Sequence, residues 1–259
     1  MDLGIKGRKA IVCASSQGLG KACATSLARE GCEVVINGRN LAKLAGTAAE
    51  IEAATGAKVR AVVADINTDA GRKALVAACP DADILVNNNA GPPPGKLADW
   101  DHDAWLPALE ANMLAPILLI RALLPGMRER RFGRIVNITS AMVKSPRAMM
   151  GLSTAARTGL TALCKSLVPE VASDNVTLNN LLPERIDTDR QRFMAERLMK
   201  EQGITMDQAR AQIVSTVAAR RMGRPHEFGD ACAYLCSEQA SFISGQNLQL
   251  DGGSYHGLI

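Results

Sequence analysis

A glycine-rich turn near the N-terminus offers the first recognisable chemistry in this sequence. CASSQGLG (13–20) follows the apolar run AIVCA (10–14) and opens a segment, 18–30, whose apolar residues recur at helical spacing. Glycines between a strand and a helix let backbone N–H groups approach a pyrophosphate at the helix N-terminus. The turn therefore predicts a dinucleotide site, formed by Ala14, Ser15, Ser16, Gln17, Gly18, Leu19 and Gly20.

The end of the second expected strand, EVVIN (33–37), indicates which dinucleotide binds. Asn37 stands where an NAD-binding sheet carries an Asp or Glu for the ribose 2′-OH, and Arg39 follows two residues later. A guanidinium fork suits the 2′-phosphate of NADP, and no carboxylate is present there to repel it. We predict NADP(H), with Arg39 as the main contact and Ser15, Ser16 or Asn40 assisting. The alternative is an exposed turn arginine without a ligand.

Short apolar runs alternate with helical segments along the rest of the chain. Further strands are expected at 59–65, 83–88, 133–140, 176–182 and 247–251, and helices at 41–54, 68–79, 101–130 and 151–172. Uniformly apolar strands that alternate with helices predict one α/β domain, 1–259, with a doubly wound parallel sheet of about seven strands. The charged stretch after the sixth strand predicts a substrate lid at about 185–215, with a solvated helix pair as the alternative.

Composition excludes several classes of protein. The chain has 47% hydrophobic residues and a net charge of only +4, without a basic run, so neither global disorder nor nucleic-acid binding is expected. No uncharged run approaches the roughly 18–20 residues of a membrane helix, and the N-terminus lacks an apolar signal core. The seven cysteines are scattered without a CxxC pair, so we expect a cytoplasmic protein with no metal site.

Several motifs, in chain order, resemble those of the short-chain dehydrogenase/reductase superfamily. The turn 13–20 resembles Thr-Gly-x-x-x-Gly-x-Gly, with Cys13 and Ala14 in place of the Thr and the first Gly. Further matches are Asp65, NNNAG (87–91), Asn112, Ser140, Pro183 and DGG (251–253). In NNNAG two registers are open, and Asn88 is an asparagine in both.

The resemblance spans about residues 5–255 and is nearest to β-ketoacyl-carrier-protein-reductase-like members. It implies a Rossmann-type domain that assembles as a homotetramer or homodimer. The cofactor contacts it adds are Asp65, Ile66, Asn88, Ala90, Gly91, Arg157, Pro183, Ile186 and Thr188. Two positions depart from the family: Glu184 replaces a Gly after Pro183, and Pro169 is expected to kink the helix at 151–172.

The resemblance also implies a catalytic set in which two members are replaced. In the family a Ser and a Tyr hydrogen-bond the substrate carbonyl, a Lys lowers the pKa of the Tyr, and an Asn, here Asn112, positions a water. Family spacing from Ser140 leads to Ser153 at the Tyr position and Arg157 at the Lys position. Serine is a far weaker acid than a phenol of pKa about 10. Arg157 stays protonated, although it can hold a ribose or an oxyanion.

Lys144, four residues after Ser140, is the main candidate for the missing proton donor. Arg147 and Arg157 are plausible cationic neighbours that would lower the pKa of Lys144, and an exposed loop lysine is the alternative. A second route uses Tyr255 and His256 from a neighbouring subunit. We therefore expect an NADP(H)-dependent oxidoreductase for a small carbonyl or alcohol substrate, with the catalytic residues Ser140, Asn112, Ser153, Arg157 and Lys144. A catalytically impaired cofactor-binding homologue and a non-redox lyase or isomerase are the alternatives.

Overall fold

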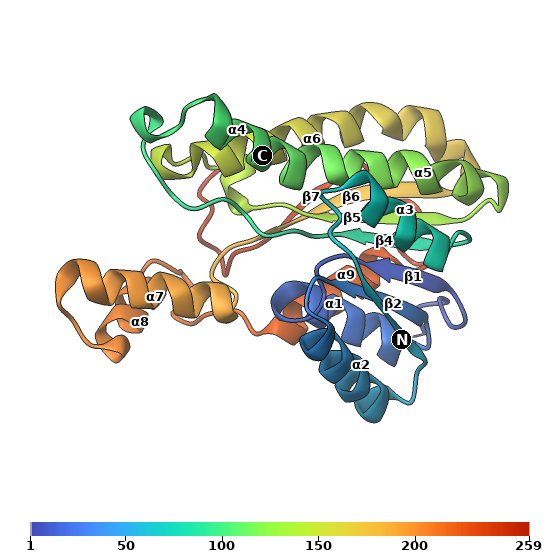
Figure 1. Ribbon diagram of the computed structural model, residues 1–259, viewed down its shortest axis with the longest axis horizontal. Helices are drawn as coiled ribbons and strands as arrows, with labels where there is room; N and C mark the ends of the chain where they lie inside the picture. The colour runs from blue at the N-terminus through green and yellow to red at the C-terminus, as the bar shows by residue number, and fades with distance from the viewer. Residues whose placement is uncertain (1, 259) are drawn as a thin grey trace.

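The computed structural model describes residues 2–258, so Met1 and Ile259 of the expected domain lie outside the described residues. The described residues form a seven-stranded parallel sheet in the order β3-β2-β1-β4-β5-β6-β7, with helices on both faces (Figure 1). The strands are β1 (Lys9–Val12), β2 (Glu33–Gly38), β3 (Val59–Val63), β4 (Ile84–Asn87), β5 (Gly133–Ile138), β6 (Val176–Pro183) and β7 (Asn247–Leu250). This confirms the doubly wound, Rossmann-type α/β fold. Ligands bind such sheets where the strand order reverses, here between β1 and β4.

Two helical layers cover the sheet. The helices are α1 (Gly18–Arg29), α2 (Leu41–Thr55), α3 (Asp69–Ala78), α4 (His102–Leu109), α5 (Ala115–Glu129), α6 (Gly151–Val171), α7 (Asp189–Gln202), α8 (Met206–Ser215) and α9 (Pro225–Leu235). One hydrophobic cluster lies under α1, α2 and α9, and the other under α3, α5 and α6. Helix α9 was not among the expected elements. It packs against α1 at Gly229, where a Cβ would collide with the carbonyl of Ala22.

Burial differs between the central and the edge strands. β1, β4, β5 and β6 are almost wholly buried, whereas every residue of β3 and β7 is partly or fully exposed. The expectation that every strand is covered on both faces is therefore wrong for β3 and β7. These two strands close the ordered sheet at its edges, and each has a strand neighbour on one side only.

A line of asparagines crosses one half of the sheet, from the central strand β4 to the edge strand β7. Asn87, Asn137, Asn180 and Asn247 are directly paired in the strand register from β4 to β7. Each amide donates to the next side chain, at 2.9 Å, 3.0 Å and 2.9 Å in turn. We call these four residues the asparagine ladder. It occupies interior positions that the sequence pattern had assigned to uniformly apolar strands.

The helical stretch expected at 101–130 is continuous from His102 to Glu129. Within this helix the α-helical hydrogen-bond pattern changes at a π-helical turn, Glu110–Leu114, which carries Asn112. The prolines do not divide the helix. Within residues 2–258 this helix is the one long and apolar enough, by length and composition, to cross a membrane, which corrects our expectation that no segment reaches that length. Its inner face packs in the core through Leu119 and Leu123. A core helix of a folded domain passes the same test.

Two further differences concern helices near the site. Pro169 lies in the last turn of α6, so it removes one hydrogen bond close to the helix end and α6 remains one helix. Helices α7 and α8 project from the body of the domain (Figure 1). They enclose a small hydrophobic cluster of their own, formed by Ala195, Ala209, Ile213 and Met222.

Candidate active site

The turn between β1 and α1 presents unpaired backbone N–H groups. Lys21 is the first residue of α1 whose N–H bonds back along the helix, to the carbonyl of Gln17 at 3.2 Å. The side chain of Gln17 does not cap the helix. The N–H groups of Gly18, Leu19 and Gly20 therefore have no partner in the described part of the chain. Such a free helix N-terminus suits a pyrophosphate, so these residues fit a dinucleotide.

The same turn is held close to the end of β4. A Cβ on Gly20 would lie 2.5 Å from the carbonyl oxygen of Ala14 and 2.9 Å from Nδ2 of Asn88, so only glycine fits. Asn88 donates to the carbonyl of Ala14 at 3.1 Å. Ala14 adopts a φ of +43°, in the left-handed region where the family motif carries glycine. The chain leaves the strand at Val12 to make this turn, so β1 is shorter than the expected strand.

The residues at the expected 2′-phosphate end have different tasks. Arg39 is exposed, and its Nη1 lies 3.9 Å from Asp65, which itself receives the N–H of Asn67. The hydroxyl of Ser15 donates to the carbonyl of Val12 at 2.7 Å, and Asn40 caps α2 by accepting from Lys43. Of the three residues proposed to assist Arg39, Ser16 is the one whose side chain makes no hydrogen bond among the described residues.

Asn37, which occupies the position of the NAD-specific acid, is a structural residue. It is 1% exposed and donates to the carbonyls of Val62 and Ala64 on the β3 side. Its Oδ1 accepts from the N–H of Ala14 at 3.4 Å. Asn37 therefore joins the end of β2 to β3 and to the cofactor turn, without adding a negative charge near Arg39.

The three consecutive asparagines after β4 separate into three environments. Asn87 belongs to the asparagine ladder, Asn88 bonds to the cofactor turn, and Asn89 donates to Asn67 at 2.7 Å and to the carbonyl of Ala111 at 3.1 Å. Asn89 thereby links the end of β4 to the π-helical turn. Sequence reasoning gave Asn89 no role, because three identical neighbours in a loop carry no signal of their direction.

The π-helical turn positions Asn112 next to the same loop. Its Nδ2 donates to the carbonyls of Ala90 and Ala108, both at 3.3 Å, and the residue is 3% exposed. Its Oδ1 is buried without a hydrogen-bond partner in residues 2–258. Turns of this type concentrate at functional sites. The free acceptor is available to a water molecule or a ligand.

The loop after β6 approaches the cofactor turn from the opposite side. A Cβ on Gly18 would lie 3.9 Å from the Cβ of Thr188, the residue before α7. Pro183 ends β6, and Ile186 is buried and bridges to Gly223. Ile66 is likewise buried, after the end of β3. The expected cofactor residues of these loops thus lie around the carboxyl ends of the strands.

Ser153 and Arg157 form a buried pair on α6. Nε of Arg157 donates to Oγ of Ser153 at 3.2 Å, while Nη1 and Nη2 donate to the carbonyls of Ile138 at 2.7 Å and Asn89 at 3.4 Å. Gly91 lies alongside, since a Cβ there would be 3.5 Å from Nη2 of Arg157 and 3.8 Å from Oγ of Ser153. The sequence-predicted residues Gly91, Ser153 and Arg157 are therefore brought together.

The charge of Arg157 is poorly compensated. Burial, assisted by the charge of Arg190, lowers the pKa of Arg157 to about 10. Its hydrogen-bond acceptors are neutral oxygens, and it forms no ion pair with any described carboxylate. Arg157 is still a cation at neutral pH, as expected, but one that gains from a nearby negative charge. Sequence reasoning did not single out Arg190, on α7, because its effect on Arg157 depends on where the fold places the start of α7.

Both candidate serines have free hydroxyl protons. Ser140 follows β5 and its Oγ accepts from the N–H of Met142 at 3.2 Å, just as Ser153 accepts from Arg157. Neither hydroxyl donates to an acceptor among the described residues. Each can therefore donate to an oxygen of a ligand without breaking a bond.

Lys144 has a different neighbour from those expected. Its Nζ lies 5.2 Å from the ring centroid of Tyr255 of the same chain, within cation–π distance. Arg147, proposed as its cationic neighbour, instead reaches Glu184 at 2.8 Å. The tail that carries Tyr255 is anchored by the buried Asp251, which accepts from the N–H of Tyr255 at 2.9 Å. Tyr255 thus reaches this loop within its own subunit.

Comparisons with known proteins agree along the whole chain. The family model described as Enoyl-(Acyl carrier protein) reductase matches residues 13–255. The NADPH-dependent reductase BacG of Bacillus subtilis is 32% identical over 252 residues, 95% of this chain and 97% of that protein. The 3-oxoacyl-(acyl-carrier-protein) reductase FabG of Vibrio cholerae is 31% identical over 263 residues, 98% of this chain and 99% of that protein. The structure of L-sorbose reductase from Gluconobacter frateurii, complexed with NADPH and L-sorbose, has a TM-score of 0.94 at 29% identity and covers 100% of both chains.

Proposed function

Since the chain belongs to the short-chain dehydrogenase/reductase superfamily, within the enoyl-(acyl carrier protein) reductase family, we propose that it interconverts a small carbonyl compound and its alcohol through a relay without the family's Tyr and Lys. It is an NADP-dependent oxidoreductase, as its NADPH-dependent relatives support. The observation that carries the rebuilt relay is the buried Ser153–Arg157 pair beside Gly91.

Different residues of the site would hold the pyrophosphate, the 2′-phosphate and the nicotinamide ribose of the cofactor. The free N–H groups of Gly18, Leu19 and Gly20 would hold the pyrophosphate, and Arg39 the 2′-phosphate. Arg157 would hold the nicotinamide ribose. When bound, NADPH supplies the hydride. The remaining chemistry, which is carbonyl orientation and proton supply, falls to the side chains of this chain.

Orientation of the substrate is assigned to the two serines. Ser140 and Ser153 would donate their free hydroxyl protons to the carbonyl oxygen. Because Arg157 bonds to Oγ of Ser153, its positive charge is transmitted to the oxygen that develops negative charge during reduction. Asn112 would hold a water through its free Oδ1. Lys144 is the proposed proton donor, since it is an acid–base side chain on the loop that begins at Ser140.

Single-turnover kinetics test this proposal. NADPH oxidation would be followed by stopped flow against a panel of ketones and aldehydes, for the wild type and for Ser140→Ala, Lys144→Ala and the control Ser166→Ala. Ser166 lies on the exposed face of α6 and bonds only to the carbonyl of Leu163 at 2.7 Å. Removing a general acid is expected to slow turnover by about 10²–10⁴-fold. Ser166→Ala should retain wild-type rates.

One competing function is favoured by a specific observation. Both family residues that carry the proton are replaced, and Ser153 and Arg157 bond to each other, as they would in a catalytically impaired cofactor-binding homologue. Tight NADPH binding without turnover, unchanged by Ser140→Ala and Lys144→Ala, would support that function. A product formed without any change in NADPH absorbance would instead support a lyase or isomerase.

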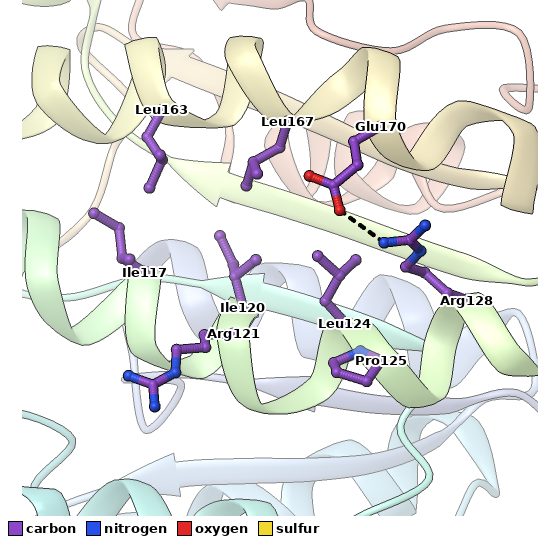
Figure 2. A pocket seen from close by; sticks show the side chains of 9 residues that line it. All are labelled: Ile117, Ile120, Arg121, Leu124, Pro125, Arg128, Leu163, Leu167 and Glu170. Atoms are coloured by element: carbon purple, nitrogen blue, oxygen red, sulfur yellow. Dashed lines mark hydrogen bonds and ion pairs between the residues drawn. The ribbon is translucent and has the colours of Figure 1, made fainter.

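We also propose a homodimer or homotetramer that buries the groove between α5 and α6. Figure 2 shows apolar side chains from both helices facing each other across a cavity of about 540 Å³. Its apolar lining includes Ile117, Ile120, Leu124, Leu163 and Leu167. At its rim Arg128 pairs with Glu170 at 2.7 Å, whereas Arg121 has no ion pair within residues 2–258 and can face Glu170 of a second copy. Light scattering of Leu124→Glu should show a smaller assembly than the wild type, and an unchanged mass would exclude this surface.

Two further proposals concern the lid and the cell compartment. Helices α7 and α8 would close over the substrate, because they project from the body and are joined to it near Ile186 and Thr188. Limited proteolysis with and without NADP+ plus substrate would detect closure as protection of residues 189–215. A cytoplasmic location is supported by seven buried free cysteines, as expected where thiols stay reduced. Microscopy of a tagged chain tests the location.

A further inference from the structure

Two loops at the carboxyl ends of β5 and β6 bring together an unbalanced group of charges. Lys144 and Arg147 lie on the loop that begins at Ser140, and Glu184 and Arg185 follow Pro183. Nη2 of Arg147 and Oε1 of Glu184, 2.8 Å apart, join the two loops. We call Lys144, Arg147, Glu184 and Arg185 the loop cluster. It contains three cations and one carboxylate.

Only one of the three cations in the loop cluster forms an ion pair with the carboxylate of the cluster. Glu184 has a largely buried side chain, 11% exposed, that pairs with Arg147. Lys144 contacts the ring of Tyr255, and neither it nor Arg185 forms an ion pair within residues 2–258. The next acidic side chain along the loop, Asp187, is paired with Arg210 on α8 at 2.8 Å. The loop cluster therefore has unused positive charge.

Arg185 is both strained and unsatisfied. Its φ is +57°, in the left-handed region that residues other than glycine rarely adopt. Its Nε is buried and donates to no acceptor in the described part of the chain. Burial lowers the pKa of Arg185, and the charge of Arg147 lowers it further against the opposing effect of Glu184. Strained residues and orphaned buried donors of this kind concentrate at ligand clamps.

We propose that Arg147 and Arg185 form a subsite for a negatively charged group of the substrate, a carboxylate or a phosphate, with Lys144 on the same loop as Arg147, and that Glu184 holds Arg147 while the subsite is empty. This inference rests on the proposed function, because the loops of the cluster begin at Ser140 and Pro183, next to the reacting carbonyl. The substrate class is then a keto acid and its hydroxy acid, or a phosphorylated ketone. Arg147 can offer such an anion a bidentate fork once it leaves Glu184.

The cofactor is the other source of negative charge near these loops. Its pyrophosphate is expected at the N-terminus of α1, where Gly18 faces Thr188. The two sources differ in a measurable way. If the loop cluster binds the substrate anion, then its variants change substrate binding and leave the dissociation constant of NADPH unchanged. If it binds the pyrophosphate, the variants weaken NADPH binding for every substrate.

Matched pairs of substrates test the subsite. The pairs are 4-oxopentanoate with its methyl ester, and dihydroxyacetone phosphate with dihydroxyacetone, so that carboxylate and phosphate are examined separately. The wild type should show a higher kcat/KM for at least one anionic member than for its neutral partner. Arg147→Gln and Arg185→Gln should raise KM for that anion about tenfold, as expected for a lost charge-assisted bond, and change the neutral partner less than twofold. Arg60→Gln is the control, because Arg60 is an exposed cation on the edge strand β3 that bonds to the carbonyl of Ala78 and forms no ion pair among the described residues.

Binding measurements separate this inference from the proposed function. Isothermal titration of 4-oxopentanoate and of its ester into the NADP+-saturated protein needs no turnover. Preferential binding of the anion, lost in Arg147→Gln and Arg185→Gln but not in Arg60→Gln, supports the subsite even if no substrate is reduced. Equal binding or turnover of both members of each pair, unaffected by the two variants, would overturn it. Weaker NADPH binding in those variants would also overturn it, in favour of a pyrophosphate contact.

Discussion

Replacing Arg157 by methionine provides a direct test of the role of its buried charge. The pKa of Arg157 falls from the usual value of an arginine to about 10, which corresponds to about 3 kcal/mol held against the charged side chain. For a base with a lowered folded-state pKa, this penalty is fully present below pH 10 and disappears only as the pH rises toward the usual pKa of arginine. Arg157→Met removes the penalty at neutral pH. It also removes three hydrogen bonds, to Ile138, Ser153 and Asn89.

The two effects oppose each other, so the cofactor-free protein should be at most moderately destabilised. A hydrogen bond from a charged donor contributes about 1.5–3 kcal/mol, and the longest of the three, at 3.4 Å, contributes least, so the two shorter bonds together contribute about 3–6 kcal/mol. Set against the penalty of about 3 kcal/mol, we expect the free energy of unfolding of Arg157→Met to fall by about 0–3 kcal/mol relative to the wild type. By contrast, removing one partner of a well-paired buried ion pair costs about 3–5 kcal/mol.

Binding of NADP+ should distinguish the wild type from Arg157→Met. If Arg157 holds the nicotinamide ribose and its charge gains from the negative pyrophosphate attached to that ribose, NADP+ stabilises the wild type more than the variant, and the dissociation constant should rise about 10–100-fold in Arg157→Met. Urea unfolding with and without saturating NADP+ measures both quantities. Arg134→Met is the matched control, because Arg134 is 0% exposed, bonds to Ser237 and Asn175, and lies at the start of β5. Its NADP+ effect should equal that of the wild type.

Two results would refute this reasoning about Arg157. One is a loss of more than about 4 kcal/mol in the cofactor-free Arg157→Met protein, which would mean that the guanidinium is a net stabilising group. The other is an unchanged NADP+ effect in that variant. Either would remove the physical ground for assigning Arg157 to the ribose.

Three further predictions concern the turn, the ladder and one surface ion pair. Ala14→Gly relieves a left-handed φ of +43° but raises the conformational entropy of the unfolded chain, so its free energy of unfolding, measured by thermal unfolding, should change by less than about 1 kcal/mol. Ala155→Gly, on the exposed face of α6, should lower the free energy of unfolding by about 1 kcal/mol. Equal losses would contradict the strain at Ala14. Asn137→Leu leaves Nδ2 of Asn87 and Oδ1 of Asn180 without their ladder partners and should cost about 3 kcal/mol in urea unfolding, against about 1 kcal/mol for Asn247→Leu at the end of the ladder. Arg221 and the N–H of Arg224 lower the pKa of Glu227 to about 2, so its contribution to stability is present above pH 4.5 and is lost as the pH falls toward 2. In Glu227→Gln the slope of stability with pH across that range should be reduced, and an unchanged slope would show that the ion pair is not coupled to folding.

The local motifs could be predicted from sequence because each depends on neighbours in the chain. The turn around Gly18 and Gly20 has a fixed order of strand, glycines and helix, and the structure places it as expected. Ser140, Ser153 and Arg157 were implied by the resemblance, whose spacing runs along one strand, one loop and one helix. The doubly wound order followed from the alternation of elements.

The remaining features depend on contacts between distant segments. Arg147 meets Glu184 and Lys144 meets Tyr255 because loops from different strands converge, which no local pattern reports. From sequence, Asn37 was considered only as a position that lacks the NAD-specific carboxylate. Its structural role depends on the register of β2 with β3. Helix α9 was missed because its polar first turn and small residues give a weak pattern.

The asparagine ladder has a consequence for motion around the site. Moving any of the strands β4 to β7 by one residue would turn its asparagine to the other face of the sheet and break the bonds to its neighbours. Asn88, Ser140 and Pro183 lie one, three and three residues beyond ladder positions, so their strand ends should fluctuate together as one rigid body. Amide protons beside the ladder should exchange with solvent only when the whole domain opens. Fast exchange would then be confined to α7 and α8, and substrate would enter by movement of those helices over a fixed floor.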